Sequence, residues 1–97
     1  MTKRDILDRI AKHAPDLRER FGVKGLWLFG SAARDQARAD SDVDMVVEFA
    51  GPPTFDAYMD LKFRLEEILG VRVDLVTRGA IRPTLKERIE KDSVLVA

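Results

Sequence analysis

Asp42 and Asp44, one residue apart, and Asp74, which lies in a similar apolar segment further along, are the residues most suited to chemistry in this chain. Residues two apart on a strand point to the same face, with backbones roughly 6.5–7 Å apart, so their carboxylates can converge on ions between them. Three carboxylates on one face repel one another, and a divalent cation relieves that cost. This spacing suits a pair of metal ions bridged by Asp42 and Asp44, with Asp74 completing the oxygen ligands.

The same spacing also fits a strand with one face in water. Alternation in "DVDMVVEF" puts one set of side chains on each face: Asp42, Asp44, Val46 and Glu48 against Val43, Met45, Val47 and Phe49. The segment "VRVDLV" alternates in the same way, with Asp74 on its more polar face. Because single-faced strands are common, periodicity alone leaves the metal site and the solvated face both open.

A Gly-Ser step at the end of the earlier apolar run "KGLWLFG" adds a second feature. Gly30 lets the backbone approach a ligand closely, and Ser31 begins a helix whose free N–H groups favour anions. Arg34, one turn later, is placed to reach a phosphate. A strand–Gly–Ser–helix junction is also frequent as plain turn and cap chemistry, so the phosphate interpretation depends on its combination with the aspartates.

Composition narrows the alternatives. The 97 residues suit one small domain, so a large substrate must be held mostly by a partner. Lysine plus arginine and aspartate plus glutamate each number 17, and this balance argues against unaided binding of long DNA or RNA. With no cysteine and one histidine, carboxylates are the plentiful metal ligands, and they suit hard ions such as magnesium.

The amino-terminal segment "MTKRDILDRIAKH" is charged throughout, and no apolar run approaches the roughly 18 residues that a membrane span needs. We therefore expect a cytoplasmic protein that does not enter a membrane.

The order of elements indicates a single α/β (α+β) domain over residues 1–97, with helices packed on a small mixed sheet. Caps and periodicity predict helices from the Thr2–Asp5 capping box to about His13, from Pro15 to before Gly22, through "SAARDQA", from Thr54 to before Gly70, and through "TLKERIEKD". The predicted strands are "KGLWLFG", "DVDMVVEF" and "VRVDLV".

Several apolar residues are expected to pack rather than bind. Trp27 and Phe29 lie in the central apolar run, and Tyr58 and Met59 belong to the longest helix, whose apolar stripe begins at Phe55. The tail "VLVA" either adds to the sheet or is covered by another chain, and the sequence leaves these two outcomes open.

A helix N-terminus, an Asp-x-Asp strand and a third strand with one aspartate together form the layout that metal-assisted nucleotidyl transfer requires. The motifs "GSAAR", "SDVDMVV" and "VDLV" resemble the G-S, D-x-D and distal-D pattern of the DNA polymerase beta nucleotidyltransferase superfamily. From about Leu26 onward the chain is similar to its minimal nucleotidyltransferase (MNT) group, including the helix "TFDAYMDLKFRLEEILG".

The resemblance implies roles for the matching residues. Asp42 and Asp44 would hold two Mg²⁺ ions at the triphosphate of ATP, Asp74 would help hold the catalytic ion and activate the attacking hydroxyl, and Gly30 and Ser31 would contact the phosphates. It also implies a hetero-oligomer with a HEPN-domain toxin that has ribonuclease-like activity. The MNT protein would be the antitoxin, and some members transfer AMP from ATP to a tyrosine of the toxin.

The family often has arginine after Gly-Ser and glycine after the later arginine, whereas this chain has Ala32 and Asp35. These departures support an alternative: a non-catalytic antitoxin that neutralises its partner by occlusion. A phosphate-accepting receiver domain fits less well, because its accepting aspartate should follow an apolar strand whereas Asp42 and Asp44 precede "MVVEF". A transfer-RNA end is a further conceivable acceptor by superfamily analogy.

Overall fold

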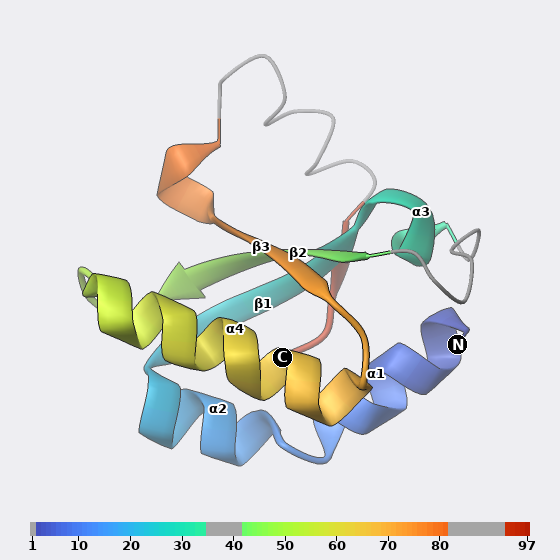
Figure 1. Cartoon of the computed structure of the whole chain (residues 1–97), viewed down its shortest axis with the longest axis horizontal. Coiled ribbons are helices and arrows are strands. Elements are labelled where there is room, and N and C mark those ends of the chain that lie inside the picture. The colour runs from blue at the N-terminus through green and yellow to red at the C-terminus, as the bar shows by residue number, and fades with distance from the viewer. Residues whose placement is uncertain (1, 35–41, 82–92) are drawn as a thin grey trace.

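Two helices precede alternating strands and helices in the computed structural model, which describes residues 2–34, 42–81 and 93–97 (Figure 1). The elements are, in order, α1 (Lys3–Ala11), α2 (Ala14–Phe21), β1 (Val23–Phe29), α3 (Gly30–Ala33), β2 (Val43–Phe49), α4 (Phe55–Leu69), β3 (Val73–Thr77), the 3₁₀ turn η1 (Arg78–Ala80) and β4 (Val94–Leu95). The predicted helix over 84–92 lies outside the described residues.

The predicted helix starts are confirmed by their caps. Thr2 and Asp5 form a capping box at α1, in which each side chain bonds the backbone N–H of the other residue. Thr54 caps α4, where its hydroxyl accepts a 3.1 Å hydrogen bond from the N–H of Ala57. Helix α4 ends at Leu69, directly before Gly70, as the sequence predicts.

Four strands form one mixed sheet in the order β3-β2-β1-β4. Strand β1 pairs antiparallel with β2 and with β4, whereas β2 and β3 run parallel. The chain between the two parallel strands contains α4, as parallel pairing requires a crossover connection. This arrangement confirms the predicted small mixed sheet with packed helices.

The carboxyl-terminal segment joins the sheet rather than standing free. Val96 N–H donates to the Leu26 carbonyl at 2.8 Å, and Leu26 N–H donates to the Ala97 carbonyl at 3.1 Å. Val94, Val96 and Ala97 also pack against the core, whereas Leu95 is 62% exposed. Of the two outcomes that the sequence left open, addition to the sheet is the one observed.

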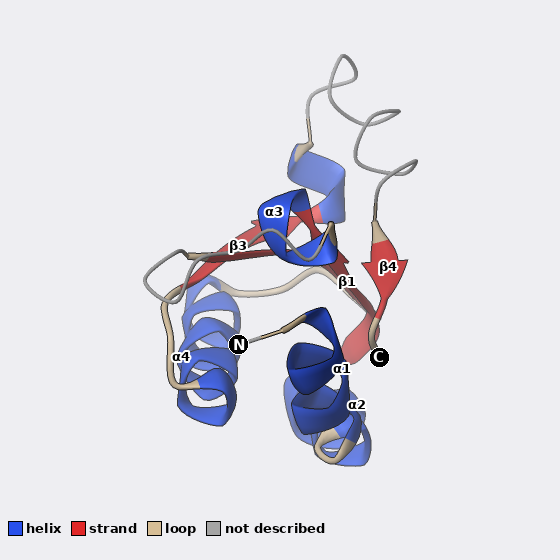
Figure 2. Cartoon of the chain, turned by 90° about the vertical axis from the view of Figure 1, so that its right-hand side faces the viewer, coloured by secondary structure: helices blue, strands red, loops and turns tan. Residues whose placement is uncertain are grey.

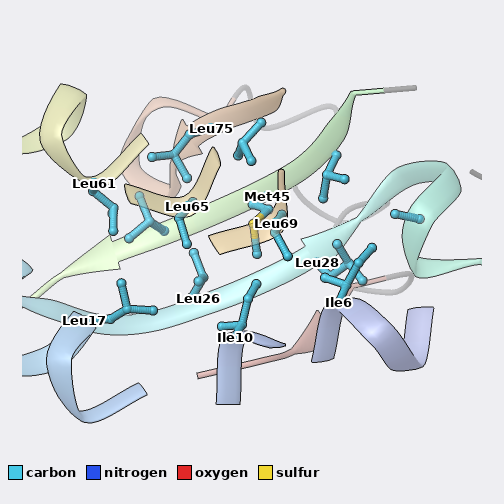
Figure 3. Close-up of a cluster of buried hydrophobic side chains, with 14 of the residues drawn as sticks. Ile6, Ile10, Leu17, Leu26, Leu28, Met45, Leu61, Leu65, Leu69 and Leu75 are labelled. Carbon is cyan, nitrogen blue, oxygen red and sulfur yellow. The ribbon is translucent and has the colours of Figure 1, made fainter. Parts of the chain in front are cut away.

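Helices α1, α2 and α4 lie on the same side of the sheet (Figure 2). Figure 3 shows the cluster between them, to which β1 and β2 contribute alternate residues. Its largest fully buried side chains are Ile6, Ile10, Leu17, Leu26, Leu28, Met45, Val47, Leu61, Leu65 and Leu69. The predicted alternation of β2 is therefore confirmed: Val43, Met45 and Val47 face the helices.

Two predictions about the core are wrong. Trp27 and Phe29 are partly exposed, because they alternate with Leu26 and Leu28 and so point away from α1, α2 and α4. The indole of Trp27 lies over Gly25, and the Arg78 guanidinium stands 5.1 Å from its ring centre. Phe55 is 75% exposed, since it opens α4 beyond the part of the helix that contacts the core.

No helix in the described part of the chain is both long enough and apolar enough to cross a membrane.

Candidate active site

Asp44 and Asp74 are direct neighbours on adjacent strands. Asp44 is the second residue of β2 and Asp74 the second residue of β3, and the two are register partners in the parallel pair. On its other side, Asp44 pairs with Phe29, the last residue of β1. Both aspartates lie on the face turned away from the core. Their neighbours Val43 and Val73 point to the opposite face and are buried in the core. The predicted convergence of these two carboxylates is therefore present.

The surroundings of Asp44 disfavour its charged form. Burial raises the pKa of the Asp44 carboxyl, and the negative charges of Asp74 and then Asp42 raise it further. A hydrogen bond with the Asp74 carboxyl acts in the same direction. This repulsion is the cost that a bound divalent cation would relieve, and the all-oxygen donors suit a hard ion such as Mg²⁺.

Gly30 is required at this site for two reasons. Its φ of 71° lies in the left-handed region, which residues with a side chain rarely adopt. In addition, a Cβ on Gly30 would stand 2.5 Å from Oδ2 of Asp44, so the carboxylate would have to move. The glycine therefore allows the end of β1 to turn directly beside the Asp44 carboxylate.

Asp42 is exposed and lies one residue before β2. Its charge acts on Asp44, so it belongs to the same electrostatic group. Within residues 2–34, 42–81 and 93–97, however, no three histidine or carboxylate groups are arranged to hold a metal ion as they stand. The structure thus brings Asp44 and Asp74 into contact and places Asp42 beside them without closing a three-ligand cage.

Helix α3 is a single turn that starts at Gly30, with Ser31 as its second residue and Arg34 directly after it. Ser31 is partly buried and Arg34 is exposed. Ala32 is 1% exposed and belongs to the core, so at this position the chain presents no side chain to a ligand. Asp35, the second departure from the family pattern, lies outside the described residues.

Glu48 shares the face of the aspartates but has other partners. It accepts a 2.9 Å hydrogen bond from Arg78 and lies 3.5 Å from the ammonium of Lys24. The hydrogen bond with Arg78 is the main cause that lowers the pKa of Glu48. Glu48 is separate from the aspartate group because it lies four residues beyond Asp44, about 13 Å further along β2.

Sequence reasoning missed two residues near Asp74. Tyr58, predicted only to pack, donates a hydrogen bond from its hydroxyl to the Leu75 carbonyl. Glu66 accepts a 3.0 Å hydrogen bond from the N–H of Val73. No local sequence signal identifies them, because they bond to the outer edge of β3, which is known only once the strand order is known.

Comparisons with known proteins agree with this geometry. The family model described as "Nucleotidyltransferase domain" matches residues 10–96. A candidate protein adenylyltransferase of Methanocaldococcus jannaschii is 40% identical over 95% of this chain and 95% of its own length. The protein adenylyltransferase MntA of Thermococcus cleftensis is 36% identical over 99% of this chain and 97% of its own length.

The solved structure of a candidate minimal nucleotidyltransferase superposes with a TM-score of 0.82 and 35% identity, over 97% of this chain and 95% of that one. Two more distant structures share the fold. A toxin-antitoxin complex with AMP-PNP has a TM-score of 0.75 and 23% identity, over 94% of this chain and 72% of that one. The MNT antitoxin bound to a tri-AMPylated Shewanella oneidensis HEPN toxin has a TM-score of 0.70 and 21% identity, over 99% and 72%.

With a family model that spans nearly the whole chain and a sheet that sets Asp44 against Asp74 beside Gly30, the chain belongs to the nucleotidyltransferase domain family and has the minimal nucleotidyltransferase fold.

Proposed function

We propose that this chain is a magnesium-dependent protein adenylyltransferase that transfers AMP from ATP to a tyrosine hydroxyl of a HEPN-type toxin and so acts as its antitoxin. The observation that carries the proposal is the juxtaposition of Asp44 with Asp74 in register, with Gly30 packed against the Asp44 carboxylate. Names of the relatives support the reaction. Neighbours of the same fold, one with an ATP analogue and one with an AMPylated HEPN toxin, support the nucleotide and the partner.

Asp42, Asp44 and Asp74 are the residues that would hold two Mg²⁺ ions. When bound, Mg²⁺ would supply positive charge that offsets the three carboxylates and the triphosphate and stabilises the transition state. Gly30, which has no side chain, would let the backbone of this turn approach the phosphates closely. Ser31, next in the same turn, would donate its hydroxyl to a phosphate oxygen.

The transfer is an in-line displacement at the α-phosphorus. The acceptor oxygen forms a bond to the α-phosphorus, the bond from that phosphorus to the oxygen bridging to the β-phosphate breaks, and pyrophosphate leaves. Asp74 would take the proton of the acceptor hydroxyl, because it lies at the edge of the aspartate pair and is exposed. Asp44 lies on an inner strand and is partly buried, so it would act as a fixed metal ligand and not as the proton acceptor.

The test is to incubate the chain with ATP labelled at the α-phosphate, MgCl₂ and the protein encoded beside it. We expect label on that partner, loss of label with Asp42→Ala or Asp74→Asn, and a labelled tyrosine by mass spectrometry. The enzymatic proposal is rejected for that partner if the wild type does not label it, or if the wild type and Asp42→Ala label it equally.

A second function, neutralisation by occlusion without catalysis, is favoured by Ala32. The family often has arginine after Gly-Ser, whereas Ala32 is short and buried and so offers no charged group to a phosphate. The Asp42→Asn, Asp44→Asn double variant separates the two functions, because occlusion requires only the complex. If that variant binds the toxin and still protects cells, occlusion is sufficient; binding without protection supports adenylyl transfer.

A further inference from the structure

Strand β3 is an edge strand, so half of its backbone groups cannot be satisfied by the sheet. Its one strand neighbour in the described sheet is β2. The Arg72 carbonyl faces β2, where it accepts a 2.9 Å hydrogen bond from the N–H of Val43. Because backbone groups of successive residues alternate in direction, Asp74 bonds toward β2 and residues 73 and 75 direct their groups to the free edge.

Two side chains of α4 satisfy this free edge. The carboxylate of Glu66 accepts from the N–H of Val73 at 3.0 Å, and the hydroxyl of Tyr58 donates to the Leu75 carbonyl. Both side chains are partly buried, with their polar atoms engaged by backbone. Val73 and Leu75 are the immediate neighbours of Asp74, so α4 holds the backbone on both sides of this aspartate.

Asp74 is therefore fixed from two directions. On the inner side its strand is paired with β2, in register with Asp44. On the outer side it lies between the two backbone groups held by α4. We propose that Tyr58 and Glu66 are positioning residues for the transfer reaction, which hold β3 so that the Asp74 carboxylate stays against Asp44. This inference rests on the proposed function for its catalytic consequence, but not for its structural one.

The tyrosine is suited to this task. Burial and, to a smaller extent, the charge of Asp74 raise the pKa of Tyr58, so its hydroxyl remains a donor at neutral pH. Its ring also lines an open pocket of about 390 Å³, together with Pro53, Phe55, Val76 and Ala80. Tyr58→Phe keeps the ring in that pocket and removes only the hydrogen bond to Leu75.

Groups that orient metal ligands without touching the metal typically change metal affinity or activity by about 10–100-fold when they are removed. The experiment compares Tyr58→Phe and Glu66→Ala with Glu66→Gln, which keeps an acceptor oxygen for the N–H of Val73. The control is Thr2→Ala, which removes the cap of α1 on a different helix. It is destabilising to a similar extent without touching β3.

Two measurements are made for each variant, below its unfolding temperature. The first is kcat and KM for ATP in the partner-labelling reaction. The second is Mn²⁺ binding by electron paramagnetic resonance in the absence of nucleotide and partner. We expect Tyr58→Phe and Glu66→Ala to lower kcat about tenfold with KM for ATP within twofold, and to weaken Mn²⁺ binding by about the same factor. Glu66→Gln should recover most of both, and Thr2→Ala should leave both unchanged.

The two proposals fail in different ways. If the wild type labels no partner but the Mn²⁺ affinities follow the expected order, the proposed function is wrong and the positioning roles stand. If Tyr58→Phe and Glu66→Ala match Thr2→Ala in Mn²⁺ affinity, these residues serve only the stability of the fold and the inference is overturned.

Discussion

The Cα atom of Gly30 faces the carboxylate of Asp44 with no room for a methyl group between them: a Cβ would stand 2.5 Å from Oδ2. The first residue of α3 and the second residue of β2 are thereby in direct contact. A substitution at Gly30 should therefore move the Asp44 carboxylate, which gives the first prediction.

Gly30→Ala should abolish transfer while leaving a folded protein. The left-handed backbone costs an alanine about 1–2 kcal/mol, and the contact with Asp44 displaces that carboxylate, which should lower kcat by at least about 100-fold. Gly22→Ala is the matched control: Gly22 has a φ of 67°, but a Cβ there would have no heavy atom within 4 Å. Chemical denaturation and partner labelling should show similar loss of stability in both variants and loss of activity in Gly30→Ala alone.

Asp44→Asn should stabilise the metal-free protein at neutral pH. Burial and the neighbouring carboxylates raise the pKa of Asp44 in the folded state above its unfolded value. The folded state therefore binds the proton more tightly, and stability falls as the pH rises from about 4, the unfolded pKa of aspartate, through the raised folded value. In EDTA the variant should melt above the wild type at pH 7, with the difference shrinking toward pH 4.

Added MgCl₂ should reverse that order. A cation that binds only the folded state raises the melting temperature of the wild type, whereas Asp44→Asn has lost a ligand and should respond less. A wild-type melting curve that is identical in EDTA and in millimolar MgCl₂ would count against a metal site at Asp44.

Acid should weaken the start of α1 through Asp5. Hydrogen bonds from the backbone and side chain of Thr2 lower the pKa of Asp5 below its ordinary value. The stabilisation is thus present above the unfolded pKa of about 4 and is lost as the pH falls through the lowered folded value. Asp5→Asn should remove this part of the pH dependence, which thermal melts between pH 2 and 5 would reveal. Unchanged acid sensitivity in Asp5→Asn would show that the capping box contributes nothing there.

The carboxyl-terminal segment, residues 94–97, offers a paired test of packing. Val96 packs against the core and bonds to Leu26 through its backbone, whereas Leu95 is 62% exposed. Val96→Ala should lower the free energy of unfolding by about 1 kcal/mol, and Leu95→Ala should change it by less than about 0.5 kcal/mol. Urea denaturation of the two variants measures the difference, and equal values would mean that the carboxyl-terminal segment does not pack in solution as it does here.

Local signals were enough to predict much of the fold. The boundaries of α4 follow from Thr54 and Gly70, and the capping box of α1 follows from Thr2 and Asp5, because caps act within one turn of chain. The two faces of β2 follow from alternation alone. For the same reason, the sequence suffices to assign Asp44 to the face opposite Val43 and Met45; the shared face of Asp42 and Asp44 stays a prediction, because Asp42 lies one residue before β2.

Non-local pairing could not be predicted in the same way. Nothing in the order of residues states that β2 and β3 are parallel, or that Asp44 meets Asp74 rather than a neighbour of it. Burial of Trp27 depended on whether helices cover one face of β1 or two. The second constraint on Gly30, contact with Asp44, and the contacts of Tyr58 and Glu66 with β3 likewise arise only once the elements are assembled.

The parallel pairing of β2 with β3 has a consequence for insertions and deletions. Side chains on a strand alternate, so displacing β3 by one residue against β2 would turn Asp74 toward the helices and bring an apolar neighbour opposite Asp44. A displacement by two would restore the face but move the carboxylate about 6.6 Å along the strand. A residue inserted or deleted within β3 itself, next to Asp74, should therefore dismantle the site, whereas one in the connecting loop can be absorbed without a change of register.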